Sequence, residues 1–145
     1  DSLTDMTDAR QLAKQQLWAA TTPAAANQAF NVTNGDVFRW KWMWSRIAEY
    51  FGLPPADYPA NLSPLEKQMG NDQIAWTQIV AEYGLKEPDI GRLVSPWHTD
   101  ADLGRPIEVV TDMSKSRAMG FTAYQASDQA FFDVFDKLRE MRLIP

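Results

Sequence analysis

The sequence predicts a mostly α-helical fold with one or two short strands. Apolar residues recur at spacings of three and four along several stretches, which is the period of an amphipathic helix. Only residues 29–33 and 107–110 combine apolar and β-branched residues in the short runs typical of strands. Glycine and proline separate these stretches, so the elements are short. The 145 residues are enough for one compact domain of ordinary size.

The first helix is expected to begin after Thr7 or Asp8, either of which can cap it, and to end before Pro23. Residues 29–33 follow as a brief strand that ends in the turn Asn34-Gly35-Asp36. The predicted core-facing stripe of the helix is mostly apolar. It consists of Ala9, Leu12, Ala13, Gln16, Leu17 and Ala20.

A second helix is expected to begin between Asp36 and Arg39 and to end at Gly52. Trp42 lies about 200° around such a helix from its neighbouring tryptophans and should face away from the core. A loop then runs over residues 53–61. The predicted core stripe of the helix is Trp40, Trp44, Ile47, Ala48 and Phe51.

Two further helices have clear start signals. Ser63 can cap the first, with Pro64 at the first helical position and Glu66 completing a capping box. Gly70 ends it, and Asp72 can cap the next. That helix ends at Gly84. Its expected apolar stripe is Trp76, Ile79, Val80 and Tyr83.

Residues 86–106 are interrupted repeatedly by proline and glycine, which predicts short helical turns and loops, and long irregular segments are often functional. This segment contains Trp97 and the chain's single histidine, His98. A short helix should follow from Ser114 to Gly120, and Ser127 can cap the last helix. The apolar face of that helix is Phe131, Val134, Phe135, Leu138 and Met141.

Composition excludes several classes of function. Without cysteine there is no disulfide, no thiolate nucleophile and no Cys-ligated metal, and a single histidine argues against a zinc site. The net charge of -5 without a basic stripe argues against nucleic-acid binding. No apolar run approaches the ~18 residues of a membrane span, and the acidic start is unlike a signal peptide. These features favour a cytoplasmic protein.

The motifs of several common enzymes are missing. No Gly-rich dinucleotide cradle, P-loop or Gly-x-Ser-x-Gly elbow occurs, and no tyrosine is followed four positions later by lysine. We therefore expect no catalytic, cofactor-binding or metal-binding residue in this chain.

Two local patterns have alternative interpretations. The residue types of a hydrolytic triad occur close together at Ser95, His98 and either Asp100 or Asp102. Proximity in the sequence does not supply the geometry of a triad. We favour a histidine that lines a pocket or caps a turn, and solvated aspartates. The tryptophans near Trp42 could stack on bases, but without a basic groove core packing is favoured. Trp42 itself is left as a pocket wall, an interface contact or surface.

Residues 30–41, with the pattern Asn-Gly-Asp-Val-Phe-x-Trp-Lys, resemble a segment of the progesterone 5β-reductase/iridoid synthase-like reductases. Trp44, Ala48-Glu49 and Phe51-Gly52 continue the resemblance, and Trp42 departs from it. The tail is also similar to extended short-chain dehydrogenase/reductases. The matching residues there are Leu103-Gly104, Asp112-Met113-Ser114-Lys115-Ser116, Gly120-Phe121 and Ile144-Pro145.

The resemblance implies an α/β parent that uses NADPH to reduce the carbon–carbon double bond of an enone or enal. It places the NADP-binding Rossmann-like portion, with the catalytic tyrosine and lysine, upstream of this chain. Residues 1–145 would be the C-terminal substrate-binding portion, inactive and without cofactor by itself. Its partners would be the Rossmann half and a small-molecule substrate.

The same resemblance suggests Trp97, His98 and Trp42 as substrate-binding residues. His98 stands where the plant enzymes have a pocket-lining aromatic residue, which suggests a smaller or more polar enone. The first helix and residues 30–32 would pack on the missing half, so the isolated chain should expose apolar surface and form homo-oligomers. Two alternatives stay open: part of a nucleotide-sugar epimerase or dehydratase, and a free-standing helical binding module.

Overall fold

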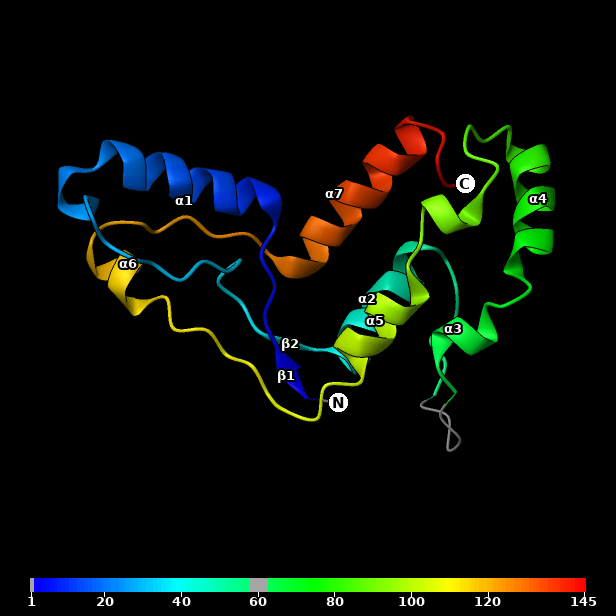
Figure 1. Ribbon diagram of the computed structural model, residues 1–145, viewed down its shortest axis with the longest axis horizontal. Coiled ribbons are helices and arrows are strands. Elements are labelled where there is room, and N and C mark those ends of the chain that lie inside the picture. The colour runs from blue at the N-terminus through cyan, green and yellow to red at the C-terminus, as the bar shows by residue number, and fades with distance from the viewer. Residues whose placement is uncertain (1, 58–62) are drawn as a thin grey trace. The chain divides into compact units, whose positions relative to one another are not determined.

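The computed structural model describes residues 2–57 and 63–145, so part of the predicted 53–61 loop lies outside the described residues. The fold is 53% helical with one two-stranded sheet, which confirms the predicted class (Figure 1). The elements, in chain order, are β1 Leu3–Thr4, α1 Ala9–Thr21, the 3-10 helix η1 Pro23–Ala25, β2 Phe38–Arg39, α2 Trp40–Tyr50, α3 Leu65–Gln68, α4 Asp72–Tyr83, the 3-10 helix η2 Ile90–Arg92, α5 Pro96–Leu103, α6 Ser114–Ala118 and α7 Ser127–Glu140.

The chain folds into two compact units, where its length suggested one domain. The first unit combines Asp1–Pro55 with Ile107–Phe131, and the second combines Ala56–Pro106 with Phe132–Pro145. Each unit is built from two separate segments, and a unit boundary falls inside α7. Two of the three boundaries directly follow prolines, Pro55 and Pro106, and the third lies inside α7, where no local pattern marks it.

Asn34 ties together three segments of the first unit. Its side chain is 1% exposed, accepts from the backbone N–H of Asp8 at 2.6 Å and donates to Ser127 Oγ at 3.0 Å. Its backbone N–H donates to Met6 O, and its carbonyl accepts from the Gln125 N–H. The side chain therefore joins the start of α1 to the start of α7.

Asp36 caps α7 from a distant part of the sequence. Its two carboxylate oxygens accept from the backbone N–H of Ser127 at 2.8 Å and from Ser127 Oγ at 2.6 Å. The prediction that Ser127 caps this helix is wrong, because Ser127 is its first residue. Between the two polar residues, Gly35 adopts a φ of +105°, and a Cβ there would lie 3.1 Å from the Tyr124 ring. Only glycine fits that turn without strain.

Helix α1 begins as predicted, since Asp8 is its N-cap and accepts from the Arg10 N–H at 2.6 Å. Its orientation is the reverse of the prediction. The buried side chains are Gln11 and Gln15, at 1% and 4% exposure, whereas Leu12 and Leu17 of the predicted core stripe are exposed. The buried amides donate to the carbonyls of Ala123 and Asn31 at 2.8 and 2.7 Å, so hydrogen bonds position this face.

The predicted strand over residues 29–33 is wrong, because the described chain pairs only β1 with β2, antiparallel, with Leu3 opposite Arg39. Residues 29–33 have no assigned secondary structure beside α1. Side chains satisfy three of their carbonyls: Lys115 bonds Ala29 O, Gln15 bonds Asn31 O, and Thr7 bonds Val32 O. These side-chain hydrogen bonds take the place of the backbone hydrogen bonds that a strand would make.

Residues 107–110 also form no strand. This segment makes one backbone hydrogen bond to the sheet, from Val109 N–H to Leu3 O at 2.9 Å. The short run lies beside β1 without building a third ladder.

Helix α2 starts at Trp40, directly after β2, and is followed by Gly52 at a φ of +68°. Met43, which is absent from the predicted stripe, is its fully buried residue. Trp42 is 46% exposed, in agreement with its predicted outward position. Trp44 is equally exposed, so its assignment to the core is wrong: the helix buries the face centred on Met43, about 100° from each adjacent residue.

The second unit shows another cap supplied from far along the chain. Asp100 accepts from the backbone N–H groups of Leu65 and Glu66 at 2.7 and 3.1 Å, at the start of α3. The predicted Ser63 cap is therefore wrong, and the residue at the N-cap position is Pro64.

In α4, Asp72 is the first helical residue and not the predicted cap. Trp76 is buried and its indole N–H donates to Glu87 O at 3.0 Å. Gly84 ends the helix in the left-handed conformation, as predicted. Tyr83 of the predicted stripe is exposed, so the buried part of this helix is narrower than expected.

Candidate substrate-binding site

Trp97 and His98 lie in the first turn of α5, in the second unit. Their rings stack with centroids 3.7 Å apart and an interplanar angle of 25°. His98 Nδ1 is 3.0 Å from Ser95 Oγ. The Trp97 side chain is 56% exposed, so the pair presents a flat aromatic surface to its surroundings. That these residues bind substrate stays a prediction.

The structure does not assemble a hydrolytic triad around His98. Asp100 has both carboxylate oxygens on the backbone of α3, and Asp102 pairs with Arg105. A triad needs a carboxylate on the imidazole nitrogen opposite the one that faces the serine. Here the serine is bonded to Nδ1, and both nearby carboxylates have other partners.

Trp42 lies in α2 of the first unit, whereas Trp97 and His98 belong to the second unit. Its ring is 6.5 Å from that of Phe38, which in turn contacts Trp40 edge-on at 5.4 Å. Trp40 also contacts Phe131 of α7. The aromatic residues of α2 therefore pack against β2 and α7 on one side while Trp42 stays half exposed.

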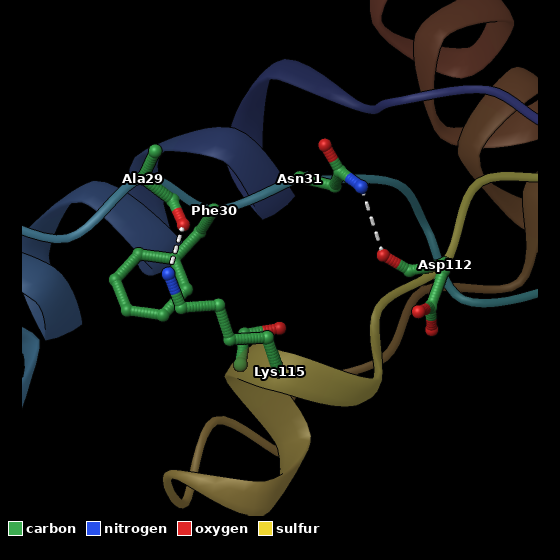
Figure 2. Close-up of a pocket in the computed structure, with 6 residues that line it drawn as sticks. Ala29, Phe30, Asn31, Asp112 and Lys115 are labelled. Carbon is green, nitrogen blue, oxygen red and sulfur yellow. Dashed lines mark hydrogen bonds between the residues drawn. The ribbon is translucent and has the colours of Figure 1, made fainter.

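A hollow of about 320 Å³ in the first unit contains residues that the sequence-based site prediction missed. Figure 2 shows Lys115 extending past the Phe30 ring to the Ala29 carbonyl, which its Nζ contacts at 2.9 Å. The ammonium lies 5.1 Å from the Phe30 ring centroid. Across the hollow, the Asn31 amide donates to Asp112 O at 3.0 Å.

Two side chains of opposite charge line this hollow. Hydrogen bonds from the Ser114 side chain and then the Ser114 backbone N–H lower the pKa of Asp112, so its carboxylate is charged at neutral pH. Lys115 is the opposite charge in the same hollow. The Asp-x-Ser-Lys pattern was the sequence signal that could have indicated this hollow. Its lysine, Lys115, joins α6 to residues 29–31.

The outward side of α1 forms a second, smaller hollow of about 150 Å³ with the neighbouring extended chain. Its lining residues are Leu12, Gln15, Gln16, Ala19, Phe30 and Val32. Gln11 Oε1 and Gln15 Oε1 have no hydrogen-bond partner within residues 2–57 and 63–145. The exposed surface here is mainly apolar, which is unusual for a helix face directed at water.

Neither a metal cluster nor a membrane span is found in the described part of the chain. Its histidine, aspartate and glutamate side chains nowhere gather in a group of three that could hold a metal ion. None of its helices has both the length and the apolar character needed to cross a bilayer.

Comparison with known proteins identifies the chain as matching a C-terminal part of the iridoid synthase/progesterone 5β-reductase family, which confirms the resemblance. It is 36% identical over 146 residues to an (S)-8-oxocitronellyl enol synthase of Nepeta cataria, a match that covers 100% of this chain. It is 35% identical over 141 residues to the 3-oxo-Delta(4,5)-steroid 5-beta-reductase of Arabidopsis thaliana, covering 95% of the chain. A Catharanthus roseus (S)-8-oxocitronellyl enol synthase is 33% identical over 144 residues.

The matches leave most of each relative uncovered. The chain spans 37% of the length of the Nepeta cataria protein and 36% of the Arabidopsis thaliana protein. No family model matches the chain. The names of the relatives support an oxidoreductase family.

Proposed function

We propose that this chain forms the substrate-side part of an NADPH-dependent reductase that acts on the carbon–carbon double bond of an enone or enal. Support comes from the relatives, whose names include a steroid 5-beta-reductase and which match along 95–100% of this chain. Alone, the chain is expected to be inactive, and absence of cysteine fits a reducing, cytoplasmic location.

The observation that carries the proposal is the reversed orientation of α1. Its polar residues Gln11 and Gln15 are buried within the first unit, and Leu17 is 66% exposed on the outside. Burial of apolar surface drives association at about 25 cal/mol per Å². An apolar helix face beside the unpaired extended segment at Phe30 and Val32 fits a surface that packs against another part of the protein.

The residues of this chain do not fit the cofactor. A dinucleotide site needs glycines in a tight turn between a strand and a helix, where the backbone approaches the pyrophosphate. The positive-φ glycines here have other roles: Gly52, Gly84 and Gly120 follow helices α2, α4 and α6, and Gly35 lies against Tyr124. We therefore assign cofactor binding and the chemistry to the other part of the reductase, and substrate contact to Trp97, His98 and Trp42.

A chimera tests the proposal. The N-terminal part of the Nepeta cataria relative, up to the start of the match, is joined to this chain, and NADPH consumption is followed at its absorbance maximum with hexenal as substrate. We expect turnover by the chimera and none by the chain alone. A soluble, folded chimera that consumes no NADPH with hexenal would contradict the proposal.

Two controls accompany this assay. UDP-glucose, supplied with NAD in place of hexenal, separates the reductase from a nucleotide-sugar epimerase or dehydratase, provided that the sugar nucleotides are analysed by chromatography, because those reactions leave the cofactor unchanged overall. The N-terminal part without this chain shows whether substrate contact needs residues 1–145, and we expect its activity to be lower than that of the chimera.

A further inference from the structure

Asn34 and Gly35 form the single Asn-Gly pair of the chain. Asparagine is one of the thermolabile residues of proteins. In an unfolded chain the backbone nitrogen of the next residue can attack the asparagine side-chain amide, and glycine obstructs the closing ring least because it has no Cβ. The other four asparagines precede glutamine, valine, leucine and aspartate. The sequence therefore contains one position at which this reaction is favoured.

The fold holds the Asn34 amide at both of its ends. Oδ1 accepts from the Asp8 N–H at 2.6 Å, and Nδ2 donates to Ser127 Oγ at 3.0 Å. Ring closure makes Cγ tetrahedral and expels Nδ2, so the planar amide that spans these two partners is lost. Because the side chain is 1% exposed, neither the ring nor the departing ammonia has space until the surrounding residues open. The reaction is thus confined to chains whose first unit has opened.

The product cannot rebuild these contacts, because they need an N–H donor at position 34. The Ser127 hydroxyl has one proton, and it donates that proton to Asp36 Oδ1 at 2.6 Å. Its oxygen is then the acceptor for Asn34 Nδ2. An ionised aspartate at position 34 offers no donor, so two carboxylates would face one hydroxyl proton. Like charges repel each other, and position 34 is excluded from water.

Isoaspartate, the second product of the same ring, also changes the main chain. The Asn34 backbone N–H donates to Met6 O at 2.7 Å, and its carbonyl accepts from the Gln125 N–H at 3.0 Å. In isoaspartate that carbonyl becomes a side-chain carboxylate, and the main chain continues through Cβ and Cγ. The extra main-chain carbon changes the spacing between the two hydrogen-bonding groups. Both products therefore lose the connection between α1 and α7.

We propose that Asn34-Gly35 is a spontaneous modification site that is protected in the folded chain and reactive in the unfolded chain. The Gly35 nitrogen loses its proton and bonds to Asn34 Cγ, the Cγ–Nδ2 bond breaks, and Nδ2 takes up a proton and leaves as ammonia. Water then opens the succinimide at either carbonyl to give aspartate or isoaspartate. The net change is hydrolysis of an amide, without oxidant or reductant. Modification after unfolding makes unfolding irreversible.

The first experiment incubates the 145-residue chain in mildly alkaline buffer, with and without denaturing guanidinium chloride. Mass spectrometry of tryptic peptide 15–39 locates the modification, and Asn27 and Asn31 in that peptide are internal controls. A synthetic peptide of residues 15–39, which lacks the partners Asp8 and Ser127, corrects for the effect of the denaturant on the chemistry.

We expect Asn34 to react at least about tenfold faster in the denatured chain than in the folded chain, which corresponds to an opening free energy of about 1.4 kcal/mol or more. In the denatured chain it should also react faster than Asn27 and Asn31. Equal rates at Asn34 with and without denaturant, no reaction in denaturant, or a control that reacts as fast as Asn34 would each overturn the inference.

The second experiment tests why the product does not recover the native fold. Asn34→Asp reproduces one product, and its urea midpoint should lie below that of the unsubstituted chain. Combining Asn34→Asp with Asp36→Asn restores one amide and one carboxylate beside the Ser127 hydroxyl, so the double variant should have a higher midpoint than Asn34→Asp alone. An Asn34→Asp chain as stable as the unsubstituted one, or a double variant no more stable than Asn34→Asp, overturns the inference.

Discussion

Replacing Asn34 with alanine should destabilise the first unit more than any exposed substitution in it. The side chain is 1% exposed and makes two hydrogen bonds, from Asp8 N–H and to Ser127 Oγ. Each bond contributes about 1 kcal/mol, and leaving the Asp8 N–H without its acceptor adds about 1–3 kcal/mol. We therefore expect Asn34→Ala to lower the free energy of unfolding by about 3–5 kcal/mol.

Urea unfolding followed by circular dichroism measures this loss as a lower midpoint at an unchanged slope. Asn71→Ala is the matched control: Asn71 is exposed at the N-cap position of α4 and makes no side-chain cap bond to a described residue. Its effect should stay within about 0.5 kcal/mol. If Asn34→Ala were as mild as Asn71→Ala, the connection of α1 to α7 through Asn34 would not be a source of stability.

Three further predictions concern other parts of the chain. Asp100→Ala should destabilise the second unit by about 1–2 kcal/mol and accelerate amide exchange in the first turn of α3, because two N–H groups lose their cap; unchanged exchange would refute the cap. The Arg10 side chain lowers the pKa of Asp8, chiefly through a hydrogen bond. The ionised Asp8 carboxylate therefore stabilises the fold at any pH above the pKa that Asp8 has in the unfolded chain. This stabilisation is lost as the pH falls through the lower pKa of the folded state. Urea midpoints of the wild type and Asp8→Asn should therefore differ at neutral pH and converge towards about pH 3; a constant gap would contradict this. Replacing exposed Leu12 and Leu17 with glutamate should convert a self-associating chain to a monomer in sedimentation without loss of helix; a wild type that is already monomeric would argue against an exposed docking face.

Helix positions were the most predictable part of the fold because they depend on nearby residues. The Asp8 cap, the glycine end of α4 and the irregular segment that contains α5 all follow from local patterns. The predicted caps at Ser63 and Ser127 failed for one physical reason. Carboxylates from distant segments, Asp100 and Asp36, occupy those helix starts, and a single sequence contains no local sign of such a contact.

The buried face of α1 could not be predicted from hydrophobicity. Gln11 and Gln15 are buried because their amides find backbone carbonyls across the unit, while Leu17 is left outside. A periodicity argument assumes that the apolar face is the buried one. It fails for α1, because this helix contacts its own unit through polar side chains and leaves Leu12 and Leu17 exposed.

The candidate site residues were predicted from the resemblance, and the structure adds the contacts around them. Sequence alone singled out Trp97 and His98, but not the contact of Ser95 with the imidazole or the capping role of Asp100. Those depend on the positions of side chains in and around α5. The Asn-Gly-Asp pattern that carried the resemblance is structural here, because Asn34 and Asp36 connect helices and lie outside the predicted substrate site.

Calorimetric titration of NADPH into the chimera and into the 145-residue chain, side by side, tests the central claim most directly. We propose that the cofactor site lies in the other part of the reductase. We expect saturable one-to-one binding by the chimera and no measurable binding by the chain. Equal affinity for NADPH in the two proteins would contradict it, because the cofactor site would then lie within these residues.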